Sequence, residues 1–238
     1  MVYNSNADSQ DIVSTVLDKA GATSITVYPL KRITRNFNSA LDLYLGWAFE
    51  AQGEHSFDDI NETSAPIDTQ DLESGINEYK FSAFTETILN LIKLTVLNSD
   101  GTEIELIPER LENLTDAFLQ IYKSSNTGTP DHYIKYGDFI YLRPYPDYSE
   151  TKGLRAYFNR PASYLASTDT TKVPGVPVIH HPLLCDMTAS QYKYDKDIIT
   201  LNEKMAIDIN AKSIVMDFFS NRSKDVKKVF KPRITPFR

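Results

Sequence analysis

The chain has 238 residues, of which 41% are hydrophobic and 24% charged, as in ordinary globular proteins, and its length allows one large core or two small ones. The formal net charge of −7 argues against general nucleic-acid binding. No apolar run is long enough for a transmembrane helix, and the lone Cys185 excludes an internal disulfide. The polar, acidic first residues lack the basic start and apolar segment of a secretion signal, so we expect a protein made in a cytoplasm.

Hydrophobic spacing predicts two helices before residue 52. Residues 9–20 fit a short helix that ends before Gly21 and places four apolar side chains on one face: Ile12, Val13, Val16 and Leu17. Residues 31–50 fit a longer amphipathic helix, near whose end Trp47 is expected as a buried anchor. The apolar stripe of this helix consists of Ile33, Phe37, Leu41, Tyr44, Leu45 and Ala48.

Strands are expected in the middle of the chain. Residues 52–75 are acidic and broken by glycine and proline, so we interpret them as loops with one short strand near Phe57. Residues 76–81, 88–97 and 103–107 are predicted strands, with a turn at NSDG (98–101) and an end at Pro108. One side of the second strand is expected to hold Ile88, Ile92, Leu94 and Val96. Residues 109–123 return to a helical spacing.

Residues 133–161 predict a tight hairpin followed by a third strand. Gly137 and Asp138 suit a two-residue turn, which would place Tyr136 opposite Phe139 and Ile134 opposite Tyr141. The prolines at 144 and 146 are expected to close the hairpin. Three apolar residues then alternate with polar or aromatic ones, as in a half-buried strand: Leu154, Ala156 and Phe158.

Two helices are predicted near the end of the chain, at 182–195 and 199–222. The buried line of the second is expected to be Leu201, Met205, Ile209, Met216 and Phe219. Helices at both ends with antiparallel strands between them indicate an α+β fold, in which terminal helices form a bundle and the strands a separate sheet or small barrel. The expected regions are 1–51 and 166–222 for the bundle, 52–165 for the β-rich middle, and 223–238 for an extended arm.

The sequence contains no clear catalytic or metal-binding pattern. His180, His181 and Cys185 are the nearest approach to a metal cluster, but adjacent histidines point apart, so we expect the pair to precede a helix and the cysteine to be a small core residue. The carboxylate pairs Asp58–Asp59 and Glu103/Glu105 are expected on exposed loops or strand faces. No glycine-rich phosphate loop is present. We therefore predict a protein without catalytic residues, metal or cofactor.

The C-terminal tail is the candidate site. Residues 222–238 hold seven basic side chains and one acidic one, so the tail carries +6 and the remaining 221 residues carry −13. Basic and apolar side chains in a segment with two prolines suit an extended arm laid on another protein. A solvated terminus and a phosphate-contacting arm are the alternatives. The arm residues are Arg222, Lys224, Lys227, Lys228, Phe230, Lys231, Arg233, Phe237 and Arg238.

From Asp71 onward the order of motifs resembles a known family. The motifs are DLESGINEYKF, NSDG, LIPER, TPDHYIKYGDFIYLRPYPDYS and GLRAYFNRPASYLASTDTTKVPG, followed by paired helices. This pattern is similar to the head-to-tail connector, or adaptor (head completion), proteins of double-stranded DNA tailed bacteriophages, over about residues 31–222. The chain departs from it at 81–83 (FSA), where a proline is expected, and in the long acidic stretch at 52–75.

The resemblance implies a structural virion protein of the neck, assembled in the host cytoplasm. It implies a dodecameric ring that docks on the portal protein, contacts neighbouring copies and tail or stopper proteins, and surrounds genome DNA without sequence-specific binding. A tail, stopper or baseplate protein is the alternative within this class. A carbohydrate-binding β module is the alternative from another class, and its candidate rings are Tyr133, Tyr141, Tyr145, Tyr148, Tyr157 and Tyr164.

Overall fold

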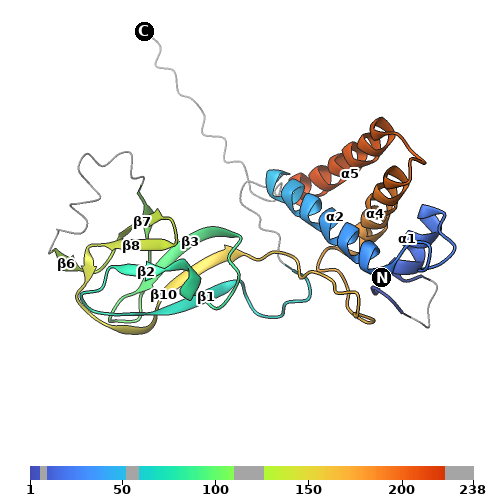
Figure 1. The fold of residues 1–238 in the computed structure, drawn as a ribbon. Helices are drawn as coiled ribbons and strands as arrows, with labels where there is room; N and C mark the ends of the chain where they lie inside the picture. The colour runs from blue at the N-terminus through green and yellow to red at the C-terminus, as the bar shows by residue number, and fades with distance from the viewer. Residues whose placement is uncertain (6–9, 52–58, 110–125, 223–238) are drawn as a thin grey trace, which may run out of the picture. The chain divides into compact units, whose positions relative to one another are not determined.

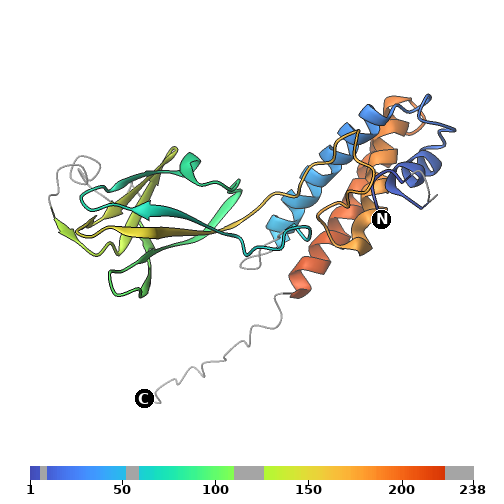
Figure 2. The same cartoon turned by 90° about the horizontal axis from the view of Figure 1, so that it is seen from below.

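The computed structural model describes residues 1–5, 10–51, 59–109 and 126–222. It is a mixed α+β protein, as expected, and divides into two compact units (Figures 1 and 2). Met1–Asn61 with Ala162–Arg238 forms a helical unit, and Glu62–Pro161 forms a β unit. The predicted strand near Phe57, the predicted helix at 109–123 and the tail after Arg222 lie outside the described residues.

Helices at both ends of the chain build the helical unit. They are α1 (Ile12–Ala20), α2 (Leu30–Ala51), α4 (His181–Asp195) and α5 (Leu201–Arg222), with a short 3-10 turn, η3 (Val178–His180), before α4. Asp11 caps α1 by accepting a hydrogen bond from the Ser14 backbone N–H at 2.6 Å, and Gly21 ends that helix in the left-handed conformation at φ 70°. These four helices lie where hydrophobic spacing predicts them.

The helices of this unit pack around one apolar core. All six residues of the predicted α2 stripe are buried there, together with residues of α1, α4 and α5. The stripe is buried because its 3.6-residue period keeps one side of α2 against α4 and α5. Trp47 is not the buried anchor expected: it is only partly buried and packs against the edge of the core.

The predicted buried line of α5 is wrong except at Phe219. Ala211, Val215 and Phe219 face the core, whereas Leu201, Met205 and Ile209 are exposed and Met216 is half-buried. Each of these rows repeats every four residues, so each satisfies the spacing of a helix face. The packing of α5 in the unit decides which row lies inside.

Two four-stranded sheets make up most of the β unit (Figure 2). The first has the order β1 (Ile67–Leu72), β10 (Glu150–Asn159), β3 (Asn90–Leu97) and β4 (Glu103–Glu105). The second has the order β2 (Glu78–Lys80), β8 (Phe139–Arg143), β7 (His132–Tyr136) and β5 (Ile107–Pro108). A two-stranded pair, β6 (Thr127–Gly128) with β9 (Tyr145–Pro146), is parallel, as is the contact of β5 with β7.

The hairpin of residues 133–143 is confirmed in register. Tyr136 pairs with Phe139 and Ile134 with Tyr141, and Gly137 has the positive φ of 59° that the turn requires. The alternating residues of β10, namely Leu154, Ala156 and Phe158, are fully buried, as predicted. The hairpin turn and the alternation of side chains along β10 therefore determine this part of the β unit.

Several predictions in the β unit are wrong. The edge strand β1 lies within a stretch interpreted as loops, because its sequence IDTQDL is polar and only Leu72 is buried. Ile92 is exposed because the pairing of β3 with β10 shifts by one residue there, between the Lys93 and Leu91 positions. The predicted strand at 103–107 is divided into β4 and β5, and Pro108 is the last residue of β5, where it pairs with Tyr133. Residues 81–83, where the family resemblance leads us to expect a proline, form a 3-10 turn, η1 (Phe81–Ala83).

Candidate protein-interaction surfaces

The first half of α5 presents an apolar surface to solvent. Leu201, Met205 and Ile209 are 51%, 49% and 64% exposed, and Ile198, just before the helix, is 61% exposed. Residues three and four apart on a helix are neighbours, so these side chains form one row. Ser213 continues the row by one turn, Asn202 and Ala206 lie beside it, and all three are exposed and uncharged. We call Ile198, Leu201, Met205 and Ile209 the α5 outer face.

A second apolar surface lies near the C-terminal end of α5. Val178 and Ile179 in η3 are 59% and 72% exposed. The next residue, His180, contacts Phe218 with ring centroids 4.6 Å apart, so η3 lies beside the last turns of α5. The predicted arm begins at this end of the helix. Arg222 is the last residue of α5, and the other arm residues lie outside the described part of the chain.

His180, His181 and Cys185 are buried in the helical core. The His180 ring lies 2.6 Å from the Tyr44 hydroxyl, and the His181 ring contacts the Val176 carbonyl oxygen at 3.1 Å. Burial lowers the pKa of both histidines and raises the pKa of the Cys185 thiol to about 12. His180 precedes α4 but makes no side-chain cap. Within the described ranges, no three His, Cys, Asp or Glu residues are placed to hold a metal ion.

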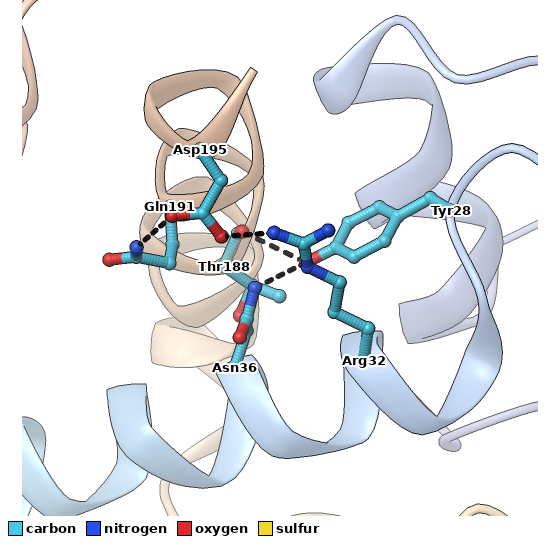
Figure 3. A network of polar contacts seen from close by, with 6 residues as sticks. All are labelled: Tyr28, Arg32, Asn36, Thr188, Gln191 and Asp195. Carbon is cyan, nitrogen blue, oxygen red and sulfur yellow. Dashed lines mark hydrogen bonds and ion pairs between the residues drawn. The ribbon is translucent and has the colours of Figure 1, made fainter. Parts of the chain in front are cut away.

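A polar network that the sequence does not reveal joins the start of α2 to α4 (Figure 3). Arg32 pairs with Asp195 at 2.7 Å, and Asp195 also accepts a hydrogen bond from Gln191. Asn36 donates a hydrogen bond to the Tyr28 hydroxyl at 2.9 Å. Burial raises the pKa of Tyr28 to about 12, so the phenol stays protonated. The network contains no nucleophile with an adjacent base, and its geometry is that of a structural contact between two helices.

Asp59 also departs from expectation, because it is buried rather than exposed. Its carboxylate accepts hydrogen bonds from the backbone N–H groups of Asn61 at 2.9 Å and Ser163 at 2.7 Å. The Ile60 N–H donates to the carbonyl oxygen of Gly175. Asp59 therefore joins its own segment to the one at Ser163, and the neighbouring Ile60 joins it to the one at Gly175.

The six candidate tyrosines differ in burial and belong to both units, Tyr164 to the helical unit and the others to the β unit. Tyr141 is buried, whereas Tyr157 lies on a sheet face, donates a hydrogen bond to Glu103 and carries Lys93 over its ring at 4.3 Å. Tyr164 belongs to the helical unit, is 55% exposed and donates to Asp42. Burial therefore removes Tyr141 from the candidate rings of a carbohydrate site.

None of the helices in the described part of the chain is both long and apolar enough to cross a membrane. Comparison of the sequence with models of known protein families, and with curated proteins, finds no match. The function is therefore inferred from the surfaces described above, together with the motif pattern of the sequence.

Proposed function

We propose that this chain is a non-enzymatic structural protein of a bacteriophage virion, a head-to-tail adaptor. In this proposal, twelve copies form a ring in the neck that docks on the portal protein and continues the DNA channel to the tail. The terminal helices form the bundle that holds the subunit contacts, and the β-rich middle forms a separate module. The observation that carries the proposal is the α5 outer face, an exposed apolar row on a helix whose other apolar row is already buried.

An exposed row of this kind favours a protein–protein contact. Contiguous apolar patches on soluble proteins commonly mark interaction sites. Burying a large aliphatic side chain contributes about 1.5–3 kcal/mol, so four such residues can stabilise a subunit contact. In a ring, this face of one copy would pack against a different face of the next copy, and the contacts would be complete only when the ring closes.

The charge distribution suits the same role. The tail of +6 follows α5 in the sequence and would reach a portal surface as an extended arm; the last described turns of α5 lie beside η3, which holds the exposed Val178 and Ile179. Residues 1–221 carry −13 and would oppose the binding of DNA phosphates along a channel wall. The arm and the body would therefore serve different partners.

Co-sedimentation with the portal complex of the same genome tests the proposal. We expect the full chain to bind in a fixed ratio, and a chain ending at Asn221 to lose portal binding. An Ile209→Glu variant should bind portal but give fewer cross-linked ring oligomers, whereas Leu43→Glu, which places the same charge on an exposed apolar site of α2, should behave as the parent chain. Absence of portal binding by the full chain would refute the portal-proximal position.

The same surfaces would serve a tail, stopper or baseplate protein. Co-sedimentation of the full chain with purified tail proteins of the same phage, in place of portal, would favour that alternative. Binding to neither would remove the head-to-tail role.

A further inference from the structure

A polar groove lies on the helical unit, away from the α5 outer face. It has a volume of about 410 Å³ and runs along the exposed side of the first half of α2. The residues that line it and bear on its chemistry are Lys31, Arg35, Asn38, Ser39, Asp42 and Tyr164. We call it the α2 groove.

Two cations, Lys31 and Arg35, line one end of the α2 groove. Among the described residues, neither the Lys31 ammonium nor the Arg35 guanidinium makes an ion pair or hydrogen bond, whereas the adjacent Arg32 pairs with Asp195 at 2.7 Å. Two like charges one helical turn apart repel each other. They also lie near the positive end of the helix dipole, and the first turn of α2 contains no acidic residue. An unfavourable charge pair without local compensation is typical of a site that binds an external group.

The opposite end of the groove has the opposite polarity. The Tyr164 hydroxyl donates a hydrogen bond to the Asp42 carboxylate at 2.6 Å, and the ring of Tyr164 is 55% exposed. Asn38 holds the facing wall in place through hydrogen bonds to the carbonyl oxygen and the N–H of Leu165, at 2.9 and 3.1 Å. The groove is therefore a fixed channel with cations at one end and a carboxylate beside an aromatic ring at the other.

We propose that the α2 groove binds an extended acidic segment of a partner protein. A carboxylate of that segment would pair with Lys31 and Arg35, and the chain would continue past the Tyr164 ring. Asp42 disfavours a uniform polyanion along the groove, and a body charge of −13 repels nucleic acid at a distance, so the polarity fits a peptide better than a phosphate backbone. This inference does not depend on the adaptor role.

Photo-cross-linking of a peptide with two glutamates followed by four serines, which carries a benzophenone, tests the proposal on the full chain. Mass spectrometry would separate cross-links to the segment around Tyr164 from cross-links to the basic tail, which would bind the same probe. We expect groove cross-links to fall at least fivefold in a K31E/R35E variant, while tail cross-links remain unchanged. The charge-neutral variant K31Q/R35Q should give an intermediate loss.

The matched control is Lys196→Glu, which makes the same charge change at an exposed lysine outside the groove, and it should leave groove cross-links unchanged. Cross-links confined to the tail, or groove cross-links that survive the K31E/R35E change, would overturn the proposal. Preferential labelling of the groove by a photoreactive DNA duplex would also overturn it, in favour of nucleic-acid binding.

Discussion

Replacing Gly175 with alanine tests how the segments of the helical unit are joined. A Cβ atom at position 175 would overlap the carboxylate of Asp59, far inside van der Waals contact. That carboxylate cannot swing away freely, because it accepts hydrogen bonds from the backbone N–H groups of Asn61 and Ser163. Gly175 is also held, since its carbonyl oxygen accepts a hydrogen bond from Ile60 at 3.1 Å.

The expected loss is about 3 kcal/mol in the free energy of unfolding. Forcing an extra carbon into a packed site costs about 1–3 kcal/mol. If Asp59 shifts and gives up one of its hydrogen bonds, a bond to a charged group contributes a further 1.5–3 kcal/mol or so. Partial relaxation of both segments keeps the total near the lower end of the combined range of about 2.5–6 kcal/mol.

Urea denaturation followed by tryptophan fluorescence measures this loss of stability in the helical unit specifically. Trp47 is the only tryptophan of the chain and packs against the helical core, so its signal reports on that unit. The matched control is Gly46→Ala, where the added Cβ meets no atom within 4 Å; in an exposed helix position it should stabilise by about 0.5–1 kcal/mol. Far-UV circular dichroism would confirm the midpoint of that variant, which is adjacent to the reporter.

A double-mutant cycle separates the overlap from other effects. Asp59→Ala alone is destabilising, but adding Gly175→Ala to it should cost little more, because the overlapping carboxylate is gone. If Gly175→Ala changes stability by less than about 0.5 kcal/mol, or if the two losses simply add, the account of Asp59 as a clamp is incorrect.

Three further predictions concern the β unit and the buried titratable groups. Leu94 is buried and Ile92 is exposed, so Leu94→Ala should destabilise the β unit by about 2–5 kcal/mol and Ile92→Ala by less than about 1 kcal/mol. Hydrogen exchange of the β unit measures both losses. Equal losses would contradict the shifted pairing of β3 with β10. Burial raises the pKa of the Cys185 thiol to about 12. A thiol reagent at about pH 8 should therefore label the native chain at least about 100-fold more slowly than the urea-unfolded chain. Rapid labelling of the native chain would contradict that burial. Burial lowers the pKa of His180 and His181 below 6.5, so the unfolded chain binds protons first as the pH falls. The urea midpoint of the helical unit should therefore be lower at about pH 5.5 than at about pH 7.5. Substitution of both histidines by glutamine should reduce this difference.

Sequence patterns predicted the elements whose residues carry a complete local signal. The α2 stripe has six apolar residues at one period, and the hairpin turn has a glycine where a positive φ is needed. Strand β1 carries no such signal, because its pairing with β10 joins residues 78–90 positions apart and five of its six residues are not buried. Distant pairing of this kind does not leave a hydrophobic pattern in the strand itself.

Sequence patterns also reveal only some of the candidate surfaces. The basic tail is visible in the sequence as a charge asymmetry, but the α2 groove is not, because Tyr164 and Asp42 are 122 residues apart in the chain. The burial of Asp59 has the same cause, since its partner Ser163 lies 104 residues away. Neither contact produces a periodic or compositional signal, so only the folded chain reveals them.

Helix α5 shows why hydrophobicity alone does not determine which face of a helix is buried. The buried row contains the small Ala211, yet it lies inside because Phe219 packs edge-on against Tyr44, with ring centroids 6.0 Å apart. The row of Leu201, Met205 and Ile209 is more apolar and remains in solvent. Since the unit completes its core without this row, stability of the isolated chain does not account for it. We propose that a contact with another protein accounts for it. The Ile209→Glu variant separates the two explanations: under this proposal it leaves the urea midpoint of the chain unchanged and reduces ring oligomers.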